Sequence, residues 1–489
     1  FLVLFLDMNN IHKDIIIIGA GVSGIGAACH LSRKHPNKSY IILESRKEIG
    51  GTWSLFKYPG IRSDSDMYTF GYPFKIWDNP KSFADAPSIL KYLNEASNQF
   101  KIKEHIKFQK RAISYNFNST KKMWTIITLD IATNKETVYT CNFIFSCSGY
   151  YNYDKGYTPK FKCQSDYKGD IIHPQKWPEK FDCTNKKIVV IGSGATAVTI
   201  VPKLASKASH ITMLQRSPTY IGTFPNKDKI ANIIKSIFPK KLAHNFIRFK
   251  NILIQIIFFN LCRSFPERMK KNIIKAAEKQ LGNYPVDPHF KPNYKPWEQR
   301  FCIAPDGDFF KVIKDGKASI ITEHIDCFTK NGILLKSGEM IEADVVITAT
   351  GLNLLAFGGT KINIDSTPFN VSKSFVYKGI MLSDLPNFFI FAGYTNASWT
   401  LKIDLTNKYI SRLFKYLKNK NYVAVEAKVN EDMLDPIPLL NLNSNYIHRT
   451  ADLFPKQGNK VPWRLHQNYI LDYKLLRIDK IKDQWLRFF

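Results

Sequence analysis

Several features that would assign a function class are missing from this chain of 489 residues. Its eight cysteines form no Cys-x-x-Cys pair, which argues against a dithiol redox centre and a zinc site, so we expect no metal. No apolar run reaches the roughly 18 residues that a membrane-spanning helix needs. Acidic residues are few, 41 against 70 Lys and Arg, but the cations are spread out without a nucleic-acid-binding motif. We therefore expect no nucleic-acid partner.

The first six residues are apolar, which is too short a run for a secretory signal, and Met8 is the expected start of the protein. Together with the scattered cysteines this predicts a cytoplasmic protein with reduced thiols. The length predicts two to three domains, and 44% hydrophobic with 23% charged residues is typical of a globular chain.

A strand–helix–strand unit is predicted near the N-terminus, over residues 14–19, 21–33 and 39–43, because a run of four isoleucines suits a buried parallel strand. The turn after the first strand has the spacing G-x-G-x-x-G. Its glycines allow a tight turn, approach of a pyrophosphate and close packing of the helix. Glu44 follows the second strand, where an acid can bind ribose hydroxyls. The residues expected to bind this dinucleotide are Gly19, Gly21, Ser23, Gly24 and Glu44.

The first nucleotide is expected to be FAD. A glycine pair at residues 50–51 lets the backbone follow the pyrophosphate of a longer nucleotide, which favours FAD over NAD. A small-residue turn at residues 349–351, after a predicted buried strand at 344–348, can close over the flavin. Gly51, Thr52 and Trp53 are therefore added to the predicted cofactor-binding residues.

A second unit of the same kind is predicted over residues 187–191, 195–208 and 210–214, with a turn of the form G-x-G-x-x-A. Arg216 follows the strand at the place where NAD-specific sites have an acid. An arginine there can bind the 2′-phosphate of NADP, so NADPH is favoured over NADH. The predicted binding residues are Gly192, Ser193, Gly194, Ala195, Thr196, Ala197, Arg216 and Ser217.

These patterns predict an α/β fold with two Rossmann-like dinucleotide-binding domains. A basic, amphipathic segment interrupts the second domain, and we expect it to pack over the active site as a helical insertion; peripheral contact with a membrane is the alternative. A last helix is expected within residues 474–489. The expected divisions are an FAD domain (8–150), an NADP domain (151–228), the insertion (229–295), a return to the NADP domain (296–330), and the rest of the FAD domain with a C-terminal segment (331–489).

Between the two turns, residues 167–178 carry the spacing G-x-x-x-H-x-x-x-W, formed by Gly169, His173 and Trp177. This resembles the fingerprint of Baeyer–Villiger monooxygenases; flavin-containing monooxygenases have a related motif without the tryptophan. Residues 50–64 resemble that family's second fingerprint. With residues 296–300 and 396–402 the resemblance covers nearly the whole chain, and it is greatest to the subgroup of the mycobacterial ethionamide-activating monooxygenase.

The resemblance implies that FAD, reduced by NADPH, reacts with O2 to give a C4a-peroxyflavin, which inserts one oxygen atom next to a ketone carbonyl and gives an ester or lactone. Arg300 matches the family's catalytic arginine, and Asp64 would pair with it. His173 is expected to anchor the linker rather than transfer protons. Two residues depart from the family pattern, Tyr167 for phenylalanine and Gln299 for lysine.

Three other functions are compatible with part of the pattern. The same flavin intermediate would oxygenate the sulfur or nitrogen of a thioether, thioamide or amine, and the sequence does not separate this from ketone oxygenation. A thioredoxin-reductase type of enzyme needs the dithiol that is missing. A membrane-bound or interaction protein without activity would not need the intact glycine turns, Arg216, Asp64 and Arg300.

Overall fold

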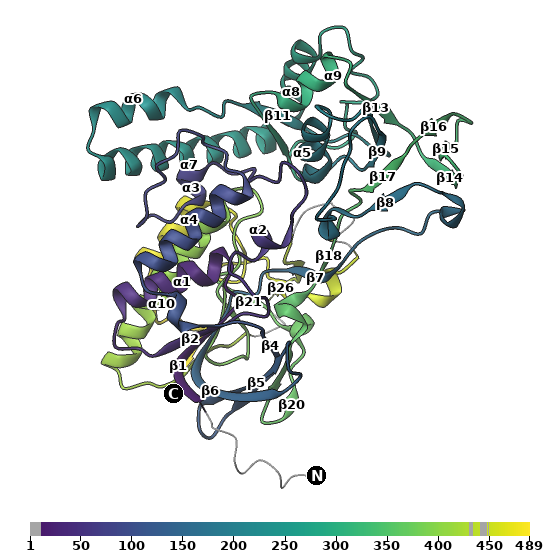
Figure 1. The fold of residues 1–489 in the computed structure, drawn as a ribbon. Coiled ribbons are helices and arrows are strands. Elements are labelled where there is room, and N and C mark those ends of the chain that lie inside the picture. Colours follow the sequence, from purple (N-terminus) through teal and green to yellow (C-terminus); the bar gives the residue numbers. More distant parts are fainter. Residues whose placement is uncertain (1–10, 430–433, 441–446, 448) are drawn as a thin grey trace.

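The computed structural model describes residues 11–429, 434–440, 447 and 449–489, and these form two main sheets with helices around them (Figure 1). The larger sheet has β1 (Ile11–Ile18) at its centre, paired in parallel with β2 (Tyr40–Leu43) and with β6 (Glu136–Ser146). The isoleucines of β1 at positions 15–17 are fully buried, as a parallel strand between two covered faces requires.

The larger sheet is completed by antiparallel strands and by strands from late in the chain. β4 (Lys110–Asn118), β5 (Met123–Asp130) and β6 form its antiparallel part. The remaining strands are β3 (Ile106–Lys107), β19 (Lys361–Ile364), β20 (Thr367–Pro368), β21 (Val376–Tyr377), β22 (Met381–Leu382) and β23 (Phe388–Ile390).

Three helices, α1 (Val22–Lys34), α4 (Ala86–Gln99) and α10 (Trp399–Asn419), cover one face of this sheet in Figure 1. Their buried side chains share a core with β1 and β2. Two short helices, α2 (Thr52–Leu55) and α3 (Met67–Phe70), lie on the connection from β2 to α4. This connection later supplies part of the site.

The smaller sheet is entirely parallel, in the order β13-β10-β9-β17-β8. Helices α5 (Ala195–Leu204) and α9 (Asp308–Lys314) contribute to its core. A small antiparallel sheet of β14 (Ile325–Thr329), β15 (Gly332–Leu335) and β16 (Met340–Glu342) follows β13 along the chain. The strands of the parallel sheet are β8 (Asp170–Ile172), β9 (Lys187–Ile191), β10 (His210–Gln215), β13 (Ala318–Thr322) and β17 (Val345–Thr348).

The position of β17 corrects one predicted boundary. The chain was predicted to return to the FAD domain at residue 331. However, β17 lies beyond that residue and pairs with β9 and β8 in the smaller sheet. Its four residues are completely or almost completely buried there, since both faces of the sheet are covered. The chain therefore leaves the smaller sheet after Thr348. The sequence of a buried apolar strand does not indicate which of two sheets the strand joins, which explains the error.

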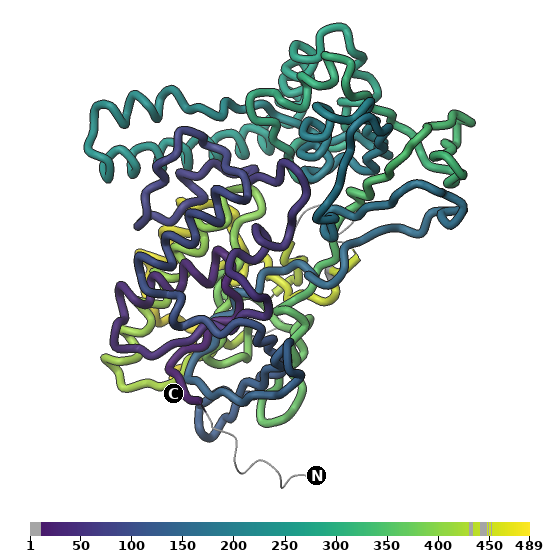
Figure 2. The backbone as a smooth tube through the Cα atoms, viewed as in Figure 1, coloured from purple at the N-terminus to yellow at the C-terminus, as the bar shows by residue number. Residues whose placement is uncertain are grey.

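The chain crosses between the two sheets along neighbouring paths. β7 (Tyr151–Gly156) leads away from the larger sheet, and β18 (Leu352–Leu354) leads back to it. The two pair with each other in an antiparallel fashion, so the outgoing and returning segments lie side by side (Figure 2). The connection between the sheets is thus a two-stranded one.

The helical insertion is confirmed as three helices, α6 (Lys229–Ile237), α7 (Lys240–Ser264) and α8 (Pro266–Leu281). The strands on either side of it, β11 (Ile221–Phe224) and β12 (Cys302–Pro305), pair in parallel. Figure 1 shows α6 and α7 as a hairpin that projects past the body, with α7 above α3. Within the described residues, no helix combines the length and the apolar character needed to cross a bilayer.

The predicted C-terminal helix over residues 474–489 is wrong in its second half. Helix α12 (Tyr469–Tyr473) continues into a single π-helical turn that ends at Ile478. The chain then forms β27 (Leu486–Phe488), which pairs with β24 (Val425–Ala427) because its alternate side chains can pack on the core. The remaining pair of strands is β25 (Ile437–Pro438) and β26 (Lys456–Gln457).

Candidate active site

One cavity of about 1120 Å3 runs between the two sheets and is lined by both glycine turns. It is larger than a pocket for one small ligand, which is typically about 300–1000 Å3, and so it suits two dinucleotides. Of the predicted residues, Gly24 and Ala197 do not line it. Those that do are Gly19, Gly21, Ser23, Glu44, Gly51, Thr52, Trp53, Asp64, Gly192, Ser193, Gly194, Ala195, Thr196, Arg216, Ser217 and Arg300.

The first glycine turn joins β1 to α1 in the geometry that a pyrophosphate site needs. Gly19 has φ +99°, which only glycine adopts readily. A Cβ on Gly24 would overlap the carbonyl oxygen of Gly19, so this third glycine serves the packing of helix on strand. No side chain caps the N-terminus of α1, and its N–H groups are therefore available to an anion.

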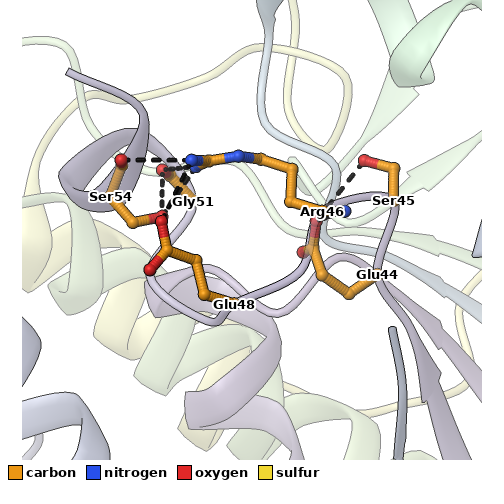
Figure 3. Close-up of polar contacts among 6 residues, drawn as sticks. All are labelled: Glu44, Ser45, Arg46, Glu48, Gly51 and Ser54. Carbon is orange, nitrogen blue, oxygen red and sulfur yellow. Dashed lines mark hydrogen bonds and ion pairs between the residues drawn. The ribbon is translucent and has the colours of Figure 1, made fainter. Parts of the chain in front are cut away.

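The segment after β2 braces both glycine segments: Glu44 contacts the first turn, and Arg46 holds the glycine pair at residues 50–51, as Figure 3 shows for Arg46 and Gly51. Glu44 is 5% exposed, and its Oε2 accepts a hydrogen bond from the Ala20 N–H at 2.7 Å. Arg46 donates from Nη1 to the carbonyl oxygen of Gly51 at 3.0 Å and to Oγ of Ser54 at 2.6 Å. Arg46 is not among the residues predicted from the sequence. Its position, two residues after Glu44 and shortly before the glycine pair, could have indicated a role at this site.

The second turn repeats this arrangement between β9 and α5. Gly192 has φ +132°, and α5 also has no side-chain N-cap. Ser193 Oγ donates to the carbonyl oxygen of Ser217 at 2.9 Å, which links the turn to the segment after β10. Arg216 lies in that segment, exposed on the cavity wall. The predicted residues of this turn are thus brought together, apart from Ala197, which is buried in the core.

The segment after α2 connects the two units. The Thr196 hydroxyl at the start of α5 lies within hydrogen-bonding reach of Tyr58, and burial raises the pKa of Tyr58 to about 12. The backbone at Gly60 packs against Lys203 of α5, and Arg62 forms an ion pair with Asp308 of α9. The second fingerprint therefore bridges the first unit to the helices of the second.

Asp64 and Arg300 lie on the wall of the same cavity. Asp64 comes from the connection between α2 and α3, and Arg300 comes from the segment between α8 and β12. Burial raises the pKa of the Asp64 carboxyl, and the positive charges of Arg300 and Arg62 oppose that rise. Burial also raises the pKa of the neighbouring Cys302 thiol to about 12, so this cysteine stays protonated. The site thus brings a guanidinium close to a carboxyl of perturbed pKa.

An aromatic cluster holds the segment that carries Arg300. Trp297 has φ +69°, an uncommon conformation for a large side chain. Its ring stacks on Phe301 at 5.9 Å between centroids and meets Phe259 of α7 at 5.5 Å. The helical insertion therefore contacts the residues on both sides of Arg300, a relationship that the sequence analysis did not find.

The linker fingerprint lies where the two connections between the sheets meet. His173 Nδ1 accepts a hydrogen bond from the Gln175 N–H at 3.1 Å, and Nε2 faces the carbonyl oxygen of Gly351 at 3.2 Å, so a neutral ring protonated on Nε2 satisfies both. Burial lowers the pKa of His173, which favours that neutral form. Gln175 donates to the carbonyl oxygens of Asn152 and Tyr153 on β7, each at 2.9 Å. His173 holds the linker, as predicted.

The turn at residues 349–351 lies beside the second glycine turn. A Cβ on Gly192 would overlap the carbonyl oxygen of Ala349, which shows how closely the two turns approach. Thr350 donates to the carbonyl oxygen of Tyr157 at 2.7 Å. These residues line the shared cavity, and their contacts are with the second turn and the linker.

Comparison with known proteins assigns the family. The model of the flavin-binding monooxygenase-like family matches residues 12–419. The chain belongs to this family. It is 47% identical to the FAD-containing monooxygenase EthA of Mycolicibacterium smegmatis, over 98% of this chain and 97% of that protein. It is 45% identical to the probable FAD-binding monooxygenase AlmA of an Acinetobacter species, over 97% of this chain and 96% of that protein.

Solved structures of similar fold agree with the two-unit α/β fold described above. A crystal structure of OTEMO in complex with FAD and NADP has a TM-score of 0.70 at 21% identity, covering 86% of this chain and 87% of that one. An open structure of cyclohexanone monooxygenase has a TM-score of 0.71 at 19% identity, covering 86% and 90%. The predicted α/β fold with two Rossmann-like units and the predicted enzyme class, a flavoprotein monooxygenase, are confirmed.

Proposed function

We propose that this flavoprotein monooxygenase binds FAD at the first turn and NADPH at the second, and inserts one oxygen atom of O2 next to the carbonyl of a ketone. The observation that carries the proposal is the shared cavity, which is lined by both glycine turns and by Arg300 and Asp64. FAD agrees with the flavin-binding family and with the FAD-containing relative EthA, and the OTEMO structure of similar fold holds both FAD and NADP.

The residues present fit both cofactors. The first turn offers uncapped helix N–H groups to a pyrophosphate, and Glu44 has lone pairs left for ribose hydroxyls after accepting from the Ala20 N–H. Gly51 has φ +56° and approaches Gly21 so closely that a Cβ on Gly51 would meet the Gly21 Cα at 3.1 Å, which brings the glycine pair against the first turn. Arg216 supplies a guanidinium for the 2′-phosphate beside the second turn.

The bound flavin, once reduced by NADPH, supplies the activated oxygen atom. Arg300 stays protonated at any working pH, and its charge stabilises the oxyanion that develops when the ketone carbonyl is attacked. Asp64 lies near enough for its charge to interact with that of Arg300, and we assign it the positioning of the guanidinium. The aromatic cluster around Trp297 fixes the segment that carries Arg300.

Oxygenation of sulfur or nitrogen is the second candidate. Transfer of oxygen to a thioether, thioamide or amine needs a protonated, electrophilic oxygen donor rather than an anionic one. Burial raises the pKa of the Asp64 carboxyl, which favours its protonated form more than an exposed site would, although the charges of Arg300 and Arg62 oppose this. The same cavity would then serve a nucleophilic sulfur or nitrogen instead of a ketone.

NADPH consumption by the purified yellow protein tests the proposal. We would compare a panel of ketones with matched thioethers of the same chain length and identify the products by mass spectrometry. The proposal predicts esters or lactones formed in a 1:1 ratio to the NADPH consumed above background. Sulfoxides without any ester would favour the second candidate, and NADPH consumption that yields only hydrogen peroxide with every compound would contradict both.

A further inference from the structure

The hairpin of α6 and α7 gathers exposed apolar side chains to an unusual degree. Eleven large apolar residues between positions 230 and 265 are more than a third exposed, and the other exposed ones are scattered over the rest of the described chain. Exposed apolar patches of this size mark interaction sites. Members of this surface include Ile233, Ile237, Phe246, Phe249, Ile257 and Leu261, with exposed fractions of 40–67%.

Helix α7 carries several polar residues on its buried side. Arg248 is 6% exposed and donates from Nη1 to the carbonyl oxygens of Tyr68, Thr69 and Gly71. Farther along the same side of the helix, Asn251 donates to the carboxylate of Asp66 at 2.8 Å, and Gln255 donates to it at 2.9 Å. These bonds fix the rotation of α7 about its axis.

The opposite side of α7 carries the apolar residues. Phe246, Phe249, Ile257 and Leu261 follow each other at intervals of three, eight and four residues, which places them along one outward stripe. The buried hydrogen bonds of Arg248 hold this stripe toward the outside. An apolar stripe of this kind on a helix with buried polar contacts needs a partner that is itself apolar.

The charges around the stripe indicate the chemistry of the partner that covers it. Residues 229–271 contain ten Lys and Arg against a single Glu. Lys229, Lys240, Lys241, Arg263 and Arg268 are exposed on this part of the chain. A second copy of the same face would set cations against cations, which disfavours a self-pairing contact. Anionic headgroups above an apolar layer match both the charge and the stripe.

We propose that the α6–α7 hairpin docks in the interface of a bilayer that contains anionic phospholipids. The helices lie along the surface and bury their exposed apolar side chains among the acyl chains near the headgroups, while flanking lysines and arginines contact phosphate. The opposite side of α7 reaches Trp297 near Arg300 through Phe259, so the docked helix lies between the lipid and the site. The proposal is independent of which atom the enzyme oxygenates.

Sedimentation of the full-length, FAD-loaded protein with lipid vesicles tests the docking. We would compare vesicles of phosphatidylcholine alone with vesicles that contain about one third phosphatidylglycerol. The bound fraction at equal lipid should give an apparent affinity at least about tenfold higher for the anionic vesicles, and added salt should weaken it. Wild-type protein that does not bind the anionic vesicles would overturn the proposal.

A pair of variants localises the contact. Ile237→Asp combined with Phe249→Asp should lower the affinity for anionic vesicles by about tenfold or more, because two apolar side chains are lost and two negative charges gained. Ile478→Asp is the matched control: Ile478 is 66% exposed and Ile237 is 67% exposed, but Ile478 lies outside the hairpin. NADPH consumption without lipid should be unchanged in both variants, which shows that they fold.

Two results would overturn the proposal. Equal vesicle binding by the double variant and the wild type would remove the hairpin from the contact. A lipid-free dimer of the wild type that the double variant converts to a monomer, measured by sedimentation equilibrium, would assign the apolar face to a second copy of the chain.

Discussion

Arg46 Nη1 donates a hydrogen bond to the carbonyl oxygen of Gly51 at 3.0 Å (Figure 3). The same guanidinium donates to the Oγ of Ser54 at 2.6 Å and to the carbonyl oxygen of Ser54 at 3.1 Å. The segment after β2, which carries Glu44, is thereby fixed to the glycine pair that follows it. One side chain thus sets the distance between the proposed ribose-binding acid and the proposed pyrophosphate-binding backbone.

Replacing Arg46 should weaken FAD binding without preventing folding. In Arg46→Ala the Gly50–Gly51 segment loses charge-assisted hydrogen bonds, each of which contributes about 1.5–3 kcal/mol, so we expect the Kd for FAD to rise at least about tenfold. Flavin fluorescence during titration of the apoprotein measures this. Lys47→Ala, at the exposed neighbouring residue, is the control and should leave the Kd unchanged.

The choice between NADPH and NADH should depend on Arg216. In Arg216→Ala a guanidinium–phosphate contact worth about 1.4–2.8 kcal/mol is lost, so the KM for NADPH should rise about 10–100-fold while that for NADH hardly changes. Arg487→Ala, at an exposed arginine far along the chain, controls for a general change in charge. Equal losses with both nucleotides would contradict the phosphate role.

Arg300 should be needed for oxygen insertion and not for reduction of the flavin. In Arg300→Ala we expect flavin reduction by NADPH at a rate close to wild type, measured by stopped-flow absorbance. Product formation should fall about 100–1000-fold, the usual effect of removing one donor to a developing oxyanion. Arg268→Ala, at another exposed arginine, is the control. Wild-type product yield from Arg300→Ala would remove Arg300 from the chemistry.

Two glycines of the turns should behave differently when a Cβ is added. Gly24→Ala should destabilise the protein by about 2–4 kcal/mol, because the new methyl group overlaps the Gly19 carbonyl oxygen. Apart from its two chain neighbours, no described residue has an atom within 4 Å of a Cβ built on Gly194. Gly194→Ala should therefore change stability by less than about 1 kcal/mol and still weaken NADPH binding. Denaturant unfolding and NADPH titration distinguish the two effects.

Acid should destabilise the protein partly through His244. Burial and the charges of Arg248 and Lys235 lower the pKa of His244 to about 4, and both of its ring nitrogens lack hydrogen-bond partners among the described residues. The unfolded chain takes up a proton near pH 6.5 and the folded one does not, so stability contributed by His244 is complete above about pH 6.5 and is lost as the pH falls toward about 4.

Substituting His244 tests this pH dependence. The His244→Leu variant has no proton to bind at this position, so its melting temperature should fall less than that of the wild type between pH 7 and pH 4.5. Burial also lowers the pKa of His30 to about 4. Because His30 is present in both proteins, both should lose some stability in acid. Identical pH dependence in variant and wild type would show that His244 is not the cause.

The glycine turns and the linker fingerprint could be predicted because their residues satisfy local requirements. Gly19 and Gly192 need a positive φ, so the spacing of the glycines located both turns. The spacing of Gly169, His173 and Trp177 located the linker through its resemblance to a known family. The sheet that β17 joins could not be predicted, since a buried apolar strand fits either one. The bracing by Arg46 and the contact of Phe259 with Trp297 depend on tertiary packing, which leaves little trace in the spacing of residues.

The most direct test of the account is the fate of isotopically labelled oxygen. Purified protein with FAD, NADPH and a ketone under 18O2 should give an ester or lactone that carries one 18O atom per molecule, with one NADPH consumed for each. A product without label, or label found only in hydrogen peroxide, would contradict the central claim that the cavity between the two glycine turns transfers an atom of O2 to a substrate.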